Sequence, residues 1–239
     1  MRSVRLPMLA VAVLLGIVLV SCGGEDSGQA PFEIEAPPKV IDSGEESRGK
    51  EEHSSAADAT DVAYRGARAT PPIPKPDLVL ADTNGKDFNI LAETEGYLTL
   101  LYLGYTHCPD ICPTHMLDLA KTLETMDPEQ VERIRVIFIT TDPARDDAAS
   151  IRRWLDLFDE SFVGLTIDDE ALAGLLSFLG MPQIIRQDLG DGRYSVNHGT
   201  YLIAFTTDNL GHIVYPFLPD GGLREIMRHD LPLLIEEGW

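Results

Sequence analysis

The stretch Gly104-Tyr105-Thr106-His107-Cys108-Pro109-Asp110-Ile111-Cys112-Pro113 decides how this chain is organised. It overlaps the end of a near-continuous apolar run at 97–105, which has the length of a central buried strand. Apolar side chains at helical spacing come next and predict a helix at about 110–126. The two cysteines therefore lie where a buried strand leads into a helix.

The spacing of the two cysteines predicts a reactive pair. Three residues separate Cys108 from Cys112, which puts the sulfurs one helical turn apart at the positive end of the helix. That end favours thiolates, and two converging thiolates favour Cu(I), with zinc as a poorer-fitting rival. A pair of core cysteines at helical spacing is the plainer alternative. Pro109 and Pro113 argue against it, because they mark a loop and a first helical turn.

Strand and helix patterns alternate through the rest of the folded part. Segments 77–81 and 88–91 flank Asn84-Gly85, the strongest short hairpin signal. Further strands are predicted at 135–140, 162–167, 199–205 and 212–217, and helices at 146–158, 169–179 and 223–235. This order predicts an α/β protein with a mixed sheet flanked by helices. With its cysteine motif it resembles the thioredoxin-like fold, elaborated by the N-terminal β-hairpin and by an insertion at about 183–196, before the strand that His198 precedes.

A tight two-thiolate site needs a third ligand. The candidates are His107, His115, His198, His212 and His229. His115 is the local rival, since it stands three residues after Cys112 on the same helical face. His198 immediately precedes the strand at 199–205, which in a thioredoxin-like topology enters beside the cysteine helix. Fold geometry therefore favours His198, and the remaining three are expected to support the site or to lie at the surface.

Three segments carry a resemblance to a known family. They are the stretch 104–113, Thr140-Thr141-Asp142-Pro143-Ala144-Arg145-Asp146, and Val196-Asn197-His198 before a strand. In this order they resemble the Sco/SenC family of copper-binding proteins, over about residues 76–239. The resemblance implies a membrane-attached, extracytoplasmic domain that binds one copper ion through Cys108, Cys112 and His198. It also implies a chaperone that helps load the dinuclear copper site of a cytochrome c oxidase subunit, with another copper donor protein as a further partner.

Thiol–disulfide exchange is the rival function. One helical turn brings Cys108 and Cys112 near the Cα separation of a disulfide, about 4.4–6.8 Å, and a low thiol pKa serves redox chemistry as well. General oxidoreductases of this fold use C-x-x-C opposite a cis-proline, whereas Asn197-His198-Gly199 holds no proline. A peroxidase is opposed by Thr106, which stands two residues before Cys108. Metal delivery and reduction of an oxidase subunit use the same thiolates, so the residues leave open whether the protein is an enzyme.

A second polar cluster follows the strand at 135–140. Asp142-Pro143 and Arg145-Asp146 come after a parallel strand, at the carboxyl edge of the sheet where the cysteines also lie. We expect Asp142 or Asp146 to cap the following helix. Docking of a partner protein is the alternative role that the resemblance suggests.

The first 22 residues resemble an export signal. Arg2 and Arg5 precede an apolar run at 6–20, which is shorter than a bilayer span requires. The next residues complete Leu19-Val20-Ser21-Cys22, which resembles the lipobox of bacterial lipoproteins. We therefore expect a lipoprotein signal at 1–22, with Cys22 lipidated and the protein held on the extracytoplasmic face of the bacterial cell membrane. An uncleaved anchor helix is the alternative.

Composition supports a division into three parts. Residues 23–75 are rich in Glu, Ser, Ala, Pro and Gly, which predicts a disordered tether between the signal and a folded domain at 76–239. The chain of 239 residues holds 39 acidic and 19 basic side chains, for a net charge of −20. That balance excludes nucleic acid as a partner, because phosphate binding needs clustered lysine and arginine. The three cysteines divide into one for a lipid and two for a metal or a reversible disulfide.

Overall fold

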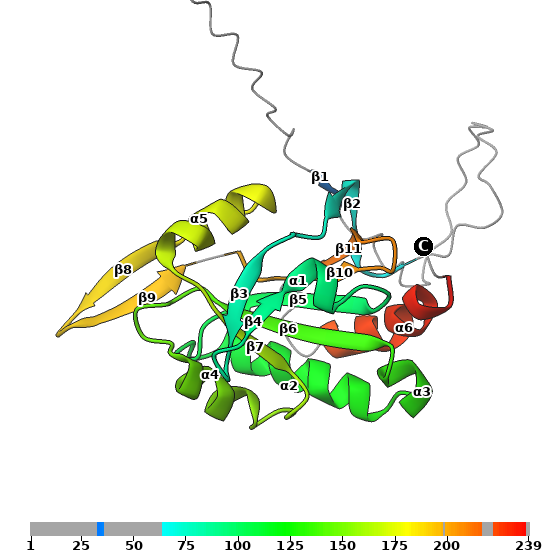
Figure 1. Cartoon of the computed structure of the whole chain (residues 1–239), viewed down its shortest axis with the longest axis horizontal. Helices are drawn as coiled ribbons and strands as arrows, with labels where there is room; N and C mark the ends of the chain where they lie inside the picture. Colours follow the sequence, from blue (N-terminus) through cyan, green and yellow to red (C-terminus); the bar gives the residue numbers. More distant parts are fainter. Residues whose placement is uncertain (1–32, 36–63, 198, 217–221, 238–239) are drawn as a thin grey trace, which may run out of the picture. The chain divides into compact units, whose positions relative to one another are not determined.

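The computed structural model describes residues 33–35, 64–197, 199–216 and 222–237, and one mixed sheet dominates them (Figure 1). Among these residues the sheet has nine strands, in the order β1 (Glu33–Glu35), β2 (Ala67–Pro74), β11 (Leu210–Pro216), β10 (Tyr201–Phe205), β5 (Leu98–Gly104), β6 (Ile134–Thr140), β7 (Val163–Thr166), β3 (Val79–Asp82) and β4 (Asp87–Asn89). β5, β6 and β7 are parallel, β10 pairs antiparallel with β5, and β11 pairs antiparallel with β10. The mixed, thioredoxin-like sheet expected from the sequence is confirmed.

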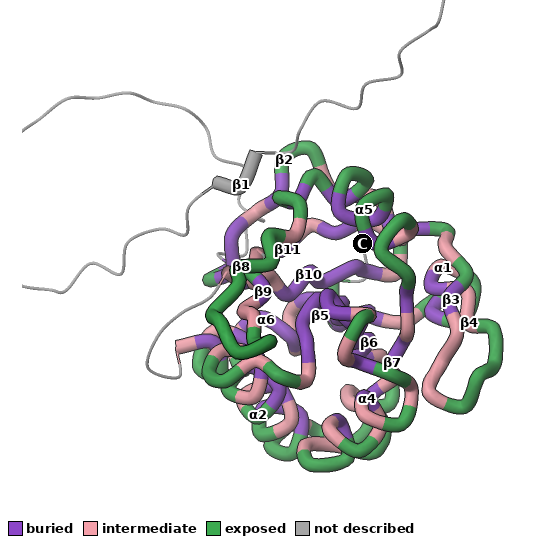
Figure 2. The backbone as a smooth tube through the Cα atoms, turned by 90° about the vertical axis from the view of Figure 1, so that its left-hand side faces the viewer, coloured by how far each residue is buried: buried purple, intermediate pink, exposed green. Residues whose placement is uncertain are grey.

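Helices cover both faces of the sheet. They are α1 (Ile90–Glu93), α2 (Ile111–Glu124), α3 (Pro128–Val131), α4 (Ala148–Leu155), α5 (Asp169–Phe178) and α6 (Gly222–Glu237). Side chains of α2, α4 and α6 pack with Leu100 and Tyr102 of β5, while α5 packs with Leu101 and Leu103 on the opposite face. Successive side chains of β5 therefore point into two hydrophobic cores, one on each face of the sheet. Figure 2 shows that the central strands are buried.

The expected N-terminal hairpin is present. β3 and β4 pair antiparallel, with Val79 opposite Asn89, and Gly85 in the turn has a φ of 75°, a value that glycine adopts without strain. The insertion before β10 is itself a hairpin, β8 (Ile185–Gly190) with β9 (Arg193–Asn197). Every residue of β8 is exposed (Figure 2), and the strand stands away from the main sheet (Figure 1). A strand with no buried face has no apolar alternation, so the sequence did not predict it.

The folded part begins earlier than the expected boundary at Pro76. Tyr64 is buried, and β2 pairs with β11 through Ala67 opposite Val214 and Ile73 opposite Gly211. Pro71 and Pro72, which suggested a linker, fall where the register between these two strands shifts, so the regular ladder does not need their missing N–H groups. The signal at 1–22 and most of the expected tether lie outside the described residues.

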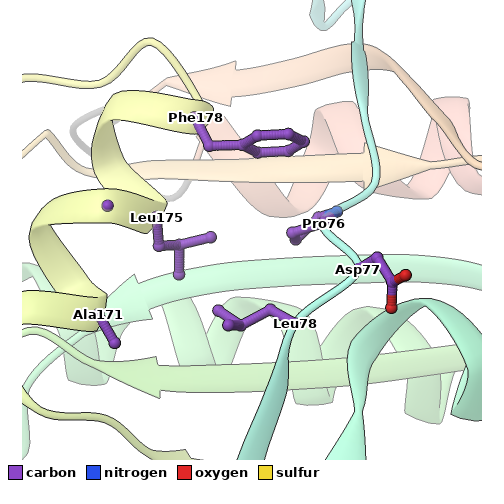
Figure 3. Close-up of a pocket in the computed structure, with 7 residues that line it drawn as sticks. Pro76, Asp77, Leu78, Ala171, Leu175 and Phe178 are labelled. Carbon is purple, nitrogen blue, oxygen red and sulfur yellow. The ribbon is translucent and has the colours of Figure 1, made fainter.

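Two surface properties complete the description. No helix among the described residues is long and apolar enough to span a membrane. An apolar groove of about 300 Å³ lies between α5 and the segment that enters β3, lined mainly by Pro76, Leu78, Leu175 and Phe178 (Figure 3). It holds no cysteine or histidine, so it offers no ligand for a soft metal.

Candidate metal centre

Both cysteines lie where β5 meets α2. β5 ends at Gly104, and α2 begins at Ile111. The short loop between them turns back on itself, with the Cys108 N–H donating to the Tyr105 carbonyl at 3.2 Å. Cys108 lies in this loop, three residues before the helix begins, and Cys112 lies in the first helical turn, as the sequence predicts.

The Cys108 sulfur sits at the open N-terminus of α2. A side-chain hydrogen bond with Cys112 and backbone N–H groups of Asp110, Cys112 and Ile111 lower the pKa of Cys108 to about 5, although burial opposes the shift. The Cys112 N–H lies 3.5 Å from this sulfur. Helix N-termini stabilise negative charge in this way. Cys108 is half-buried, so a thiolate there can be reached from solvent.

Cys112 has the opposite character. It is fully buried, and its hydrogen bond to Cys108 together with burial raises the pKa of the Cys112 thiol well above the ordinary value. The two cysteines are free in this structure, so the pair amounts to one accessible thiolate and one enclosed thiol. A metal that takes both sulfurs must displace the Cys112 proton.

Gly104 makes the space in which Cys112 sits. A Cβ on Gly104 would lie 2.6 Å from Tyr102 Cε1, 3.0 Å from Phe138 Cε2 and 3.2 Å from the Cys112 sulfur. Real Cβ atoms do not approach carbon so closely, so a larger residue would push these groups apart. The glycine that ends β5 is therefore required by close packing under the second cysteine.

Asp146 ties the cysteine loop to the neighbouring strand. Its Oδ2 accepts from the Thr106 N–H at 2.9 Å and from the Thr140 hydroxyl at 2.7 Å. Its Oδ1 accepts from the Thr106 hydroxyl at 2.6 Å and lies 3.2 Å from His107 Nδ1. The side chain is completely buried. This role is missed by the sequence, which suggested a helix cap.

Asp142 is also buried, and it holds the β8–β9 hairpin. It accepts hydrogen bonds from Arg145 and, at 2.8 Å, from the Tyr194 hydroxyl of β9. The Arg145 guanidinium lies 3.8 Å from the Tyr194 ring centre and donates to the Tyr194 carbonyl at 3.1 Å. The expected capping by Asp142 or Asp146 is wrong: Asp147 caps α4, through the Ser150 N–H at 2.7 Å.

The histidines separate into different environments. His198 lies outside the described residues, as does the lipidation candidate Cys22. His115 is buried in α2, with its ring centre 5.6 Å from that of Tyr102, and burial lowers the pKa of His115 to about 4. Within the described part of the chain, no three Cys, His, Asp or Glu side chains form a group that could hold a metal. The geometry therefore gives no support to His115 as a ligand beside the cysteines.

The remaining histidines bind carboxylates. His107 is half-exposed beside Asp146. His229 neighbours Asp230 on α6, at 2.7 Å, and is partly exposed. The side chain of His212 is partly buried, with 13% of it exposed, and its Nε2 lies 2.8 Å from Asp208.

Comparison with known proteins decides the family. The model of the SCO1/SenC family matches residues 69–221. The chain belongs to this family. This SCO1/SenC protein is 34% identical over 154 residues to an SCO2-like protein of Rickettsia felis, a match that covers 63% of this chain and 72% of the relative. The fold and the family that the sequence predicts are both confirmed.

Solved structures give the same result. Apo Sco1 of Thermus thermophilus is 30% identical, with a TM-score of 0.63 and coverage of 73% of this chain and 99% of that chain. ScoI of Bradyrhizobium japonicum, solved with copper bound, is also 30% identical, with a TM-score of 0.58 and coverage of 68% and 99%. Copper is therefore the metal that relatives of this chain bind.

Proposed function

We propose that this SCO1/SenC protein binds one copper ion through Cys108, Cys112 and His198. The observation that carries the proposal is the pair of hydrogen-bonded cysteines at the start of α2, with Cys108 partly exposed and of lowered pKa and Cys112 buried. Two soft sulfur donors suit Cu(I), and a neutral imidazole completes a three-coordinate site. The copper-bound relative at 30% identity supports the choice of metal.

The described neighbours of His198 support its assignment. β10 runs antiparallel to β5 with Leu202 opposite Tyr102, so the chain just before Tyr201 enters the sheet at the end where β5 leads to Cys108. On the other side of position 198, the backbone of Val196 hydrogen bonds to the Tyr105 side chain, which itself contacts Cys108. Both flanking segments thus lie beside the cysteine loop.

Copper bound here is cargo. The proposed role is that of a chaperone, anchored by a lipid on Cys22 to the extracytoplasmic face of the bacterial membrane, which helps assemble the dinuclear copper site of cytochrome c oxidase. Family membership and the lipobox-like segment Leu19-Val20-Ser21-Cys22 support this role. The partly exposed position of Cys108 also fits cargo transfer, because an incoming thiolate can reach the metal from that side.

A competition titration with Cu(I) tests the ligand set. Reduced protein should take up one Cu(I), and Cys108→Ser, Cys112→Ser and His198→Ala should each weaken binding. His115→Ala is the matched control, since it removes the rival histidine on the cysteine helix. Loss of binding in His115→Ala together with unchanged binding in His198→Ala would show that the assignment is wrong.

Disulfide reduction is the second candidate function. It is favoured by the depressed pKa of Cys108, the property of an attacking thiolate, beside a second cysteine that can resolve a mixed disulfide. Incubation with a copper-free oxidase subunit, reduced in one arm and oxidised in the other, separates the two. The chaperone proposal requires the copper-loaded protein to transfer metal to the reduced subunit, whereas a reductase acts only as the metal-free dithiol.

A further inference from the structure

Asp146 accepts hydrogen bonds from two separate segments, the end of β6 and the loop that carries Cys108. Thr140 ends β6, and Thr106 and His107 belong to the loop that leads from β5 to Cys108. One buried carboxylate therefore joins the end of a parallel strand to the two residues immediately before the first cysteine. A loop of this length has few hydrogen bonds of its own, and an external carboxylate fixes its path.

The hydrogen bonds of Asp146 show that it does not cap helix α4. α4 is already capped by Asp147, whose Oδ1 accepts from the Ser150 N–H. The side-chain hydrogen bonds of Asp146 run instead to Thr106, His107 and Thr140. The carboxylate is therefore committed to the loop.

We propose that Asp146 is a positioning residue for the metal site, which sets where the Cys108 sulfur lies relative to Cys112. The inference rests on the proposed function for its connection with copper, while its geometric part concerns the two sulfurs alone. Groups behind the ligands of a metal site fix ligand orientation, and their removal typically weakens metal binding by about 10–100-fold.

Two substitutions separate position from charge. In Asp146→Asn the amide oxygen can still accept from the Thr106 N–H and the Thr140 hydroxyl. Its NH2 group would face the Thr106 hydroxyl and His107 Nδ1, both of which can act as acceptors. Asp146→Ala removes all four contacts. Both variants lose the same charge, so a positioning role predicts different effects and a role of charge alone predicts equal ones.

Asp230 provides a matched control. It is a fully buried carboxylate on α6, and it accepts from the Arg65 N–H at 3.0 Å and from the Gly66 N–H at 2.8 Å. These contacts hold the chain at the entry to β2 rather than the cysteine loop. Asp230→Ala should therefore lower stability without moving the two sulfurs.

The experiment measures Cu(I) affinity by competition, and in parallel the affinity for phenylarsine oxide, which two neighbouring thiols must bridge. Thermal melts of every variant report stability. We expect Asp146→Ala to lose about 10–100-fold in both affinities. Asp146→Asn should stay close to the unsubstituted protein. Asp230→Ala should change both affinities by no more than about twofold, as expected for a site without shared partners.

Two results overturn the inference: equal losses in Asp146→Asn and Asp146→Ala, or a loss in Asp146→Ala no larger than in Asp230→Ala. The arsenical measurement keeps the inference separate from the proposed function. If the unsubstituted protein captures phenylarsine oxide and fails to bind Cu(I), the copper proposal is wrong. The ratio between the Asp146 variants for phenylarsine oxide then decides the positioning role.

Discussion

The backbone N–H of Cys112 donates to the sulfur of Cys108 across 3.5 Å. It adds to the side-chain hydrogen bond between the two cysteines, which lowers the pKa of the partly exposed Cys108 and, together with burial, raises the pKa of the enclosed Cys112. The next partner to arrive, whether metal ion or disulfide, meets Cys108 first.

Alkylation should reveal this inequality. With a Cys108 pKa of about 5, its thiolate is formed across neutral pH, so the rate with iodoacetamide should be nearly constant above about pH 6 and fall below it. Cys112 should remain unmodified in the folded protein. Mass spectrometry of reduced, metal-free protein measures both, with urea-unfolded protein as the control. Comparable rates for the two cysteines in the folded state would contradict the assignment.

Gly104→Ala should disturb the packing around the Cys112 sulfur. The added methyl group overlaps Tyr102 and Phe138 and presses on the Cys112 sulfur, so we expect a loss of about 1–3 kcal/mol in the free energy of unfolding and weaker Cu(I) binding. Gly174→Ala in α5 is the control, since nothing lies within 4 Å of its Cβ position and alanine favours a helix by about 0.5–1 kcal/mol. Urea unfolding measures both, and equal effects at the two positions would be inconsistent with the close packing.

His115 should make the protein sensitive to mild acid. Burial lowers the pKa of His115 to about 4 in the folded protein, whereas the imidazole of the unfolded chain is protonated below about pH 6.5. Stability contributed by the neutral imidazole is thus complete at pH 7 and declines as pH falls toward 4. Between pH 7 and pH 5, the unsubstituted protein should lose about 1–2 kcal/mol more than His115→Phe. Identical losses in urea unfolding would show that His115 is not held neutral.

Arg145→Ala should loosen the β8–β9 hairpin. The substitution removes the ion pair with Asp142 and the stacking and hydrogen bond on Tyr194. Amide hydrogens of β9 should then exchange about tenfold faster or more, since a hydrogen bond of a charged group contributes roughly 1.5–3 kcal/mol. Arg193→Ala is the control, because its contact with Asp191 is long and exposed. Unchanged exchange in Arg145→Ala would mean that other contacts hold the hairpin.

Local sequence patterns predicted the central part of the fold well. The runs that became β5 and β6 are mostly apolar, and the spacing of Cys108 and Cys112 is consistent with the helix start between them. β8 was missed because both of its faces are exposed, so its sequence shows no apolar alternation. β2 was missed because Pro71 and Pro72 suggested a linker, although they fall at an irregularity in its pairing with β11.

Long-range contacts in the site were beyond the sequence. The bond between Asp146 and Thr106 joins residues 40 positions apart, and no local pattern distinguishes Asp146 from Asp147, which became the cap. The unequal character of the two cysteines likewise depends on burial, which spacing alone does not give.

X-ray absorption of the Cu(I)-loaded protein tests the central claim most directly. The account predicts two sulfur ligands and one imidazole nitrogen per copper, with the nitrogen lost in His198→Ala and retained in His115→Ala. A site that keeps its nitrogen in His198→Ala, or that loses it in His115→Ala, would contradict the proposed ligand set.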